Sequence, residues 1–163
     1  MRIKTWAVAC IAVAGVAALA GGDARAEKKH TPYYASISAS RARMRTGPGR
    51  TYPANWLYQR PDLPVKVVEI YKEWRKVEDP GGIQGWMLAN LLSDTRTAVV
   101  ASNVVELRDS PRPGGRILWR AAPGVVGRLS KCAGGWCWFD VHGRAGFVET
   151  TRLWGIDSGE TLS

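Results

Sequence analysis

The stretch Arg43-Met44-Arg45-Thr46-Gly47-Pro48, followed by Gly85-Trp86-Met87 and Leu91, decides the fold because it occurs twice. The second copy is Val105-Glu106-Leu107-Arg108-Asp109-Ser110-Pro111, followed by Gly146-Phe147-Val148 and Leu153. The spacing between the copies is nearly constant: 63 residues from Arg45 to Arg108, 62 from Trp74 to Trp136, and 61 from Trp86 to Phe147. Landmarks repeated in one order at one spacing predict two copies of a small domain.

Short apolar runs separated by Gly, Pro and Asp fill the space between these landmarks, and no long stretch has a helical period. This pattern is typical of an all-β protein. In the first copy, residues 65–70 and 74–78 are predicted to be adjacent strands, and residues 88–91 a short helical turn. Residues 136–141 correspond to the second of these strands. Strand alternation then predicts a core position for Phe139.

Both copies resemble the bacterial SH3 family, whose small barrels occur in cell-envelope proteins. The family pattern is an apolar-Arg-x-x-Pro segment, a Trp that opens a strand ending in Val, a Gly-Trp-Val segment and a terminal Leu. It is matched at residues 44–48, 74–77, 85–87 and 91, and again at 107–111, 136–141, 146–148 and 153. The resemblance implies an all-β chain of two tandem SH3-like small β-barrels. One departure is Phe147, which stands where the family has Trp, so the copies need not share one ligand specificity.

The repeat divides the chain into six parts. We predict a signal peptide (1–26), a flexible leader (27–35), a first SH3-like domain (36–92), a linker (93–101), a second SH3-like domain (102–156) and a C-terminal tail (157–163). The linker contains the apolar residues 98–100. We expect that stretch either to start the first strand of the second domain or to pack between the domains.

The N-terminus has the features of an export signal. Arg2 and Lys4 precede an uncharged apolar run at residues 6–20, and Ala24-Arg25-Ala26 fits a small-x-small cleavage site. The run is shorter than the roughly 20 residues of a membrane-spanning helix. A cleaved signal is therefore favoured over an uncleaved anchor. This predicts a periplasmic or otherwise extracytoplasmic protein with no stable membrane span after cleavage.

The chain is basic, with 23 Lys and Arg against 14 Asp and Glu and a net charge of +9. Removal of residues 1–26 would take away three basic residues and one acidic residue and leave +7. A basic surface attracts polyanions. Because an exported chain rarely meets nucleic acid, anionic wall polymers or lipid headgroups are the better candidates. The alternative is that the charge mainly aids solubility.

Two cysteines follow the predicted cleavage site, Cys132 and Cys137, and Gly134-Gly135 lies between them. In an oxidising compartment, a close pair flanking a Gly-Gly turn predicts a disulfide across a hairpin. A loop this short contributes about 2 kcal/mol to stability. A redox-active or metal-binding pair is less favoured, because the spacing is not Cys-x-x-Cys and no second ligand pair exists.

Catalytic signals are weak in this sequence. The two histidines, His30 and His142, have no cysteine or serine beside them in a catalytic pattern. No paired His or Cys cluster offers a metal site. We therefore expect a protein that is not an enzyme and that uses neither a cofactor nor a metal.

Aromatic and basic residues carry the remaining functional signal. Flat aromatic side chains bind peptides or sugars at low entropic cost, while arginine steers anionic groups. The predicted ligand-facing residues are Arg45, Tyr52, Trp74, Arg108, Trp136 and Trp138. The alternative is structural: most of the aromatic residues could pack in the barrels, and Arg45 and Arg108 could hold loop carbonyls.

These observations favour an exported, non-enzymatic module whose tandem domains recognise cell-wall peptidoglycan or its stem peptides. The alternative is a periplasmic adaptor that binds an extended or proline-rich segment of an envelope protein, since SH3-like barrels present grooves and sheet edges. A third reading is a purely structural or stress-related envelope factor. The sequence predicts no oligomeric state.

Overall fold

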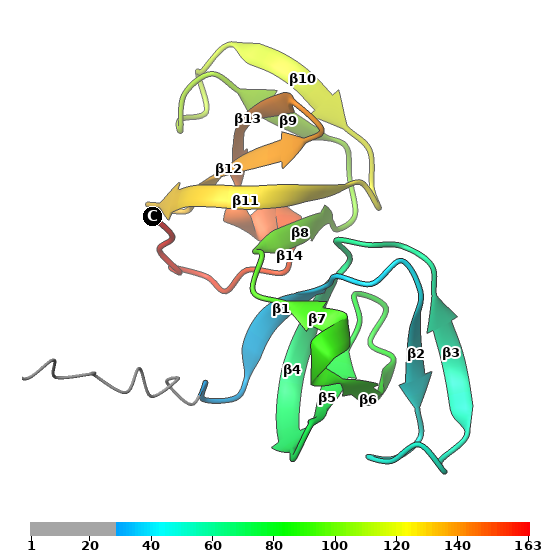
Figure 1. The fold of residues 1–163 in the computed structure, drawn as a ribbon. Coiled ribbons are helices and arrows are strands. Elements are labelled where there is room, and N and C mark those ends of the chain that lie inside the picture. The colour runs from blue at the N-terminus through cyan, green and yellow to red at the C-terminus, as the bar shows by residue number, and fades with distance from the viewer. Residues whose placement is uncertain (1–28) are drawn as a thin grey trace, which may run out of the picture.

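The computed structural model describes residues 29–163, and the predicted signal peptide lies outside them. The described residues form β-strands and two short 3₁₀ turns, arranged as two seven-stranded antiparallel sheets that each curl around a core of their own (Figure 1). The prediction of an all-β protein with two small tandem barrels is confirmed. No helix in residues 29–163 has the length and hydrophobicity needed to span a membrane.

The first barrel has the strand order β3-β2-β6-β5-β4-β1-β7. Its elements are β1 (Tyr33–Ile37), β2 (Ala42–Arg45), β3 (Ala54–Tyr58), β4 (Pro64–Tyr71), β5 (Trp74–Glu78), β6 (Gln84–Leu88), η1 (Ala89–Leu91) and β7 (Leu92–Ser93).

The second barrel repeats this order as β10-β9-β13-β12-β11-β8-β14. Its elements are β8 (Thr97–Val100), β9 (Val105–Arg108), β10 (Ile117–Ala121), β11 (Val126–Ala133), β12 (Trp136–Val141), β13 (Arg144–Glu149), η2 (Thr150–Arg152) and β14 (Leu153–Trp154).

Strand register confirms that the repeated residues occupy equivalent places. Arg45 on β2 is paired with Trp86 on β6, as Arg108 on β9 is paired with Phe147 on β13. Met44 faces Trp56 across β2 and β3, and the equivalent strands β9 and β10 pair Leu107 with Trp119. The sequence repeat is therefore a structural repeat.

Glycine in the repeated Gly-Trp-Met and Gly-Phe-Val segments permits a close approach of strands. A Cβ on Gly85 would lie 2.5 Å from Cγ of Met44, and one on Gly146 would lie 2.8 Å from the backbone of Leu107. Because both contacts are far shorter than van der Waals distance, only glycine lets β6 and β13 pass β2 and β9 here. This requirement explains why both copies carry glycine at this position.

Each barrel has its own apolar core. Val77 lies in the core of the first, and Phe139 occupies the equivalent place in the second; both are fully buried. The core position predicted for Phe139 is thus confirmed.

The structure differs from the predicted leader and linker at the first strand of each barrel. Residues 33–35 of the leader belong to β1 and pair with β4, and residues 97–100 of the linker form β8, which pairs with β11 and β14. The physical reason is burial: Ala35 lies in the first core, and Ala98 and Val100 lie in the second. Of the two alternatives for the linker stretch, the structure shows the first strand of the second barrel.

Polar and aromatic contacts join the two barrels. The hydroxyl of Ser36 on β1 lies 2.6 Å from that of Thr97 on β8. The ring of Tyr34 meets that of Trp154 edge-on, with centroids 5.4 Å apart. On another side, Arg60 donates to the carbonyl oxygen of Gly124 at 2.9 Å. The two barrels are therefore in direct contact with each other and are not joined by a flexible linker alone.

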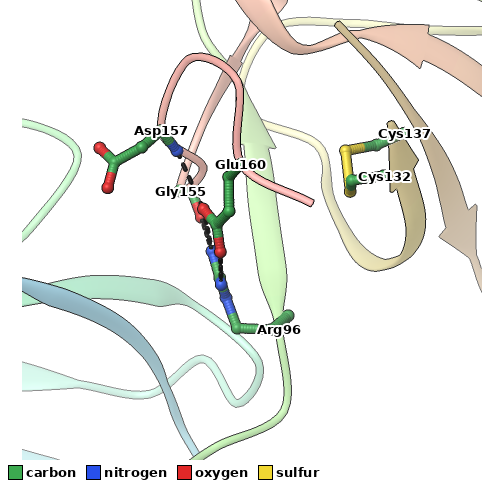
Figure 2. Close-up of a disulfide and its surroundings, with 6 residues drawn as sticks. All are labelled: Arg96, Cys132, Cys137, Gly155, Asp157 and Glu160. Carbon is green, nitrogen blue, oxygen red and sulfur yellow. Dashed lines mark hydrogen bonds and ion pairs between the residues drawn. A yellow bond between two sulfur atoms is a disulfide. The ribbon is translucent and has the colours of Figure 1, made fainter. Parts of the chain in front are cut away.

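The C-terminal tail folds back onto the second barrel, close to the disulfide (Figure 2). Cys132 and Cys137 form the predicted disulfide, and both are fully buried. The backbone N–H of Leu162 donates to the carbonyl oxygen of Cys132 at 3.0 Å. Arg96, just before β8, forms an ion pair with Glu160 through two guanidinium nitrogens.

Candidate functional site

A surface cavity of about 400 Å³ lies on the first barrel. Residues of β2, β3, β5 and β6, together with the loops beside β2 and the turn η1, form its wall. The lining residues are Arg41, Arg43, Arg45, Arg50, Leu57, Trp74, Leu88 and Leu91.

The alternation of β2 produces the arginine side of this cavity. Its sequence is Ala-Arg-Met-Arg, and Ala42 and Met44 are buried in the core. Successive side chains of a strand point to opposite faces, so Arg43 and Arg45 project outward together. Arg41 lies one step earlier in the same two-residue period. Three arginines are thus gathered by strand geometry alone.

Arg45 also holds the loop that follows β2. Its Nη1 donates to the carbonyl oxygen of Tyr52 at 2.6 Å. The Tyr52 ring lies against Gly47, where an added Cβ would come within 2.4 Å of ring carbon Cδ1. This loop therefore has a defined conformation, and it carries Arg50 to the cavity.

The cavity of the first barrel is positively charged. Within residues 29–163, none of its four arginines has a carboxylate oxygen within the 4.0 Å of an ion pair, and no acidic residue lines it. Trp74 is only 4% exposed and contributes to a largely apolar wall together with three leucines. Such a site suits an anionic group attached to a small apolar one.

The second barrel has a cavity of about 550 Å³ at the equivalent place. Arg108 lines it and donates through Nη1 to the carbonyl oxygen of Gly115 at 2.6 Å, the counterpart of the Arg45 bond. Trp136 takes the place of Trp74. The full lining is Asn103, Val104, Val105, Glu106, Arg108, Arg120, Trp136, Val148, Glu149 and Arg152.

Charges in the second cavity are paired with one another. Glu106 accepts from Arg108, and its other oxygen lies 3.4 Å from Nη2 of Arg120. Glu149 lies 3.8 Å from Nε of Arg152. Three arginines and two glutamates therefore neutralise much of each other's charge within this cavity.

Four of the six predicted ligand-facing residues line these cavities. Arg45 and Trp74 meet in the first, and Arg108 and Trp136 meet in the second. The alternative role for Arg45 and Arg108 is also observed, because both hold loop carbonyls.

The other two predicted residues lie outside the cavities. Tyr52 is exposed on the loop that Arg45 holds. Trp138 is half-buried and packs edge-on against Phe147, with centroids 5.1 Å apart.

Sequence reasoning missed two kinds of exposed residue. Arg41, Arg43 and Arg50 were not selected, although the two-residue period of the first two with Arg45 was visible in the sequence. Trp56 and Trp119, which are 49% and 46% exposed, lie on the edge strands β3 and β10. Their 63-residue separation, the same as that of Arg45 and Arg108, is the signal that could have linked them.

Residues 29–163 contain no group of three or more His, Cys, Asp or Glu side chains that could hold a metal ion. The first cavity presents guanidinium groups and an apolar wall to a ligand, and the second presents guanidinium groups beside two glutamates.

Comparisons with known proteins identify the family of this chain. The solved structures that are similar include NlpC1 and NlpC2 from Trichomonas vaginalis, each at 12% identity and a TM-score of 0.35. The alignments cover 77% and 78% of this chain and 46% and 51% of the other chains, so this chain spans about half the length of each. No curated protein matches the sequence. The family model for the bacterial SH3 domain matches residues 38–94 and again 101–155, and the chain therefore belongs to the bacterial SH3 domain family, of which it carries two tandem copies.

Proposed function

We propose that this protein is an exported, non-enzymatic binding protein of the cell envelope whose tandem SH3 domains recognise peptidoglycan or its stem peptides. The observation that carries the proposal is the pair of equivalent surface cavities, each of which combines an arginine with a tryptophan. The predicted signal peptide supports a periplasmic or otherwise extracytoplasmic location.

The cavities suit recognition of a polymer that carries peptides. Arginine presents a planar fork of donors that matches a carboxylate. Tryptophan and the leucines of the first cavity offer apolar surface to the rest of the ligand. The second barrel, held beside the first, can add contacts to the same polymer, which raises the overall affinity beyond that of the first barrel alone.

Peptidoglycan is the envelope polymer that best fits these features. Its stem peptides end in carboxylates and contain small apolar residues. An exported basic protein meets this polymer in its own compartment, and electrostatic attraction speeds the encounter. Membership of the bacterial SH3 domain family supports the same ligand class.

Co-sedimentation with purified sacculi tests this proposal. The protein should pellet with intact sacculi and be released when an amidase has removed the stem peptides. Equal binding to stripped sacculi would place recognition on the glycan strands. A protein that stays in the supernatant with intact sacculi at low salt would contradict the proposal.

The edge strands favour a second candidate function. β3 and β10 each lie at the edge of a sheet and carry a half-exposed tryptophan, Trp56 or Trp119. An edge strand can pair with an extended segment of another protein. The chain would then be a periplasmic adaptor.

Crosslinking in intact cells separates the two candidates. Recovery of one envelope protein in fixed proportion, lost on Trp56→Ala, would favour the adaptor. Recovery mainly with murein, unchanged by that substitution, would favour the wall binder.

A further inference from the structure

We propose that the first barrel alone holds the ligand's carboxylate, in the cavity formed by Arg41, Arg43, Arg45 and Arg50, and that the equivalent cavity of the second barrel does not bind one. The inference rests on the proposed function and adds to it the ligand group and the domain that recognises it. It is carried by the difference in charge between two cavities that are otherwise built alike.

Position by position, the first barrel exposes charge where the second barrel neutralises it. Arg43 faces Leu57 across β2 and β3, whereas the equivalent pair in β9 and β10 is Glu106 and Arg120. Arg43 thus has an apolar cross-strand neighbour. In the second barrel the same place holds a carboxylate that already accepts from two arginines.

The wall formed by β5 and β6 in the first barrel, and by β12 and β13 in the second, also carries more negative charge in the second barrel. Trp74 is paired with Leu88 across β5 and β6, while Trp136 is paired with Glu149 across β12 and β13. The second wall therefore brings another carboxylate into the cavity, where it pairs with Arg152. An incoming anion would face both glutamates there.

Four like charges around one cavity repel each other and disfavour the folded state. In the first cavity, no carboxylate oxygen of residues 29–163 lies within 4.0 Å of these arginines to offset this repulsion directly. The leucines and Trp74 give one side of the cavity an apolar wall, and electrostatic attraction to an anion bound against an apolar wall is stronger than in open water. An anionic ligand relieves the repulsion and gains several charge-assisted hydrogen bonds.

The lining also indicates what the carboxylate belongs to. Leu57, Leu88 and Leu91 lie beside the arginines. They offer contact to a small apolar side chain next to the charged group, as in a peptide that ends in such a residue. A peptide carboxylate is therefore the ligand group we infer, in preference to a free inorganic anion.

Calorimetric titration of the purified protein tests this inference. The probes are a synthetic tetrapeptide of stem-peptide composition, the same peptide with its carboxylates amidated, and inorganic phosphate. We expect one carboxylate peptide bound per chain, with affinity at least tenfold above that of the amidated peptide and of phosphate. Equal affinity for phosphate would overturn the inference of a peptide ligand.

Arg43→Glu provides the loss-of-function variant, because it places the residue of the second barrel in the first. The side chain of Arg43 is exposed and forms no hydrogen bond with another of the residues 29–163, unlike those of Arg45 and Arg108. Its replacement therefore removes no contact that the fold needs, and the barrel should fold. We expect at least a tenfold loss of affinity. Arg112→Glu is the matched control: it makes the same charge change on an exposed loop residue outside both cavities and should leave the affinity unchanged. Equal loss in both variants, or none in Arg43→Glu, would overturn the inference.

The reciprocal substitution tests whether the glutamates keep the second cavity from binding the peptide. Glu106→Arg with Glu149→Leu replaces both glutamates of the second cavity by the residues that the first barrel has at those two positions, and should raise the stoichiometry from one peptide to two. A wild-type stoichiometry of two would contradict the inference directly. Sacculus binding that persists unchanged in Arg43→Glu would overturn the inference and leave the proposed function standing. Peptide binding without any sacculus binding would overturn the proposed function alone.

Discussion

Arg43 and Glu106 occupy the same position in the two barrels, on β2 and β9, and they give the two cavities different electrostatic character. Arg43 adds to the arginine cluster of the first cavity, whereas Glu106 accepts hydrogen bonds from two arginines of the second barrel, Arg108 and Arg120. The duplicated domain has thus kept one framework and changed the charge of its surface. This difference connects the repeat seen in the sequence to the ligand specificity proposed for the first barrel.

The framework shared by the barrels includes the arginine that holds the loop after β2 or β9. Arg108→Ala should lower the free energy of unfolding by about 1–2 kcal/mol, because the carbonyl oxygen of Gly115 loses a charged donor and Glu106 loses a partner. Chemical denaturation measures the change. Arg116→Ala, on an exposed side chain in the same loop, should change the stability by less than about 0.5 kcal/mol. Similar losses in both variants would contradict the role given to Arg108.

A buried hydrogen bond stabilises the first barrel only. The hydroxyl of Tyr58 donates to Oδ2 of Asp79 at 2.9 Å, and Oδ1 of Asp79 accepts from two backbone N–H groups of the following turn. The equivalent residues of the second barrel, Ala121 and Val141, are apolar. Tyr58→Phe should therefore cost about 1–3 kcal/mol, since it leaves a buried carboxylate oxygen without its donor. Tyr52→Phe removes an exposed hydroxyl and should be nearly neutral; a comparable cost in both would contradict this account.

This hydrogen bond also predicts a pH dependence. Burial, and then the hydrogen bond to Asp79, raise the pKa of Tyr58 well above its ordinary value of 10.0. When the pKa of Tyr58 is higher in the folded state than in the unfolded state, its contribution to the free energy of unfolding is complete below the pKa of the unfolded state. This contribution is lost as the pH rises through the pKa of the folded state. The stability of the wild type should therefore fall above about pH 10. Tyr58→Phe should show a smaller fall, and an equal fall would exclude Tyr58 as its source.

The ion pair between Arg96 and Glu160 holds the C-terminal tail. Burial alone would raise the pKa of Glu160, but hydrogen bonds from Arg96 and from the backbone N–H of Asp157 lower it below its ordinary value. When the pKa of Glu160 is lower in the folded state than in the unfolded state, its contribution to the free energy of unfolding is present above the pKa of the unfolded state. This contribution disappears as the pH falls through the pKa of the folded state. Glu160→Gln should lower the stability by about 1 kcal/mol at neutral pH. The gap from the wild type should close below about pH 4, and a gap that widened there would contradict this reasoning.

The disulfide should contribute about 2 kcal/mol to the stability of the second barrel, given its short loop. Reduction with a phosphine should lower the melting temperature of the wild type by several degrees. The double variant Cys132→Ser, Cys137→Ser should melt lower and should not respond to the reductant. A wild type with two reactive thiols at these positions in protein recovered from its native compartment would overturn the disulfide.

The repeat was recognisable from sequence because its physical causes are local. The glycines of the Gly-Trp-Met and Gly-Phe-Val segments permit close strand approach, and the alternation around Phe139 identifies a core position. The cysteine pair was predictable for the same reason, since only four residues separate Cys132 from Cys137. Each of these features depends on neighbours in the chain or on one strand pairing.

The extent of the barrels was harder to predict, because it depends on distant partners. Residues 33–35 and 97–100 are strands through their pairing with β4 and β11. The apolar residues 98–100 left two alternatives open, a strand or a contact between the domains, and only the pairing partner shows which one holds.

The cavities required knowledge of cross-strand neighbours as well. Only the fold shows that Glu106 and Arg120 face each other, and that Trp74 is a buried wall while Trp56 is exposed. The choice of Trp138 as a ligand-facing residue rested on alternation, which gives the face of a strand but not what packs over it.

The central claim is that the first barrel binds the carboxylate of a peptidoglycan stem peptide. Nuclear magnetic resonance titration of the ¹⁵N-labelled protein with a soluble muropeptide tests it most directly, because each backbone amide reports its own surroundings. The claim predicts saturable shifts at residues 41–50, 57, 74 and 88–91, and none of comparable size at 104–108, 120, 136 and 149–152. Shifts confined to the second barrel, shifts along the edge strands β3 and β10 alone, or no shifts at millimolar muropeptide would contradict it.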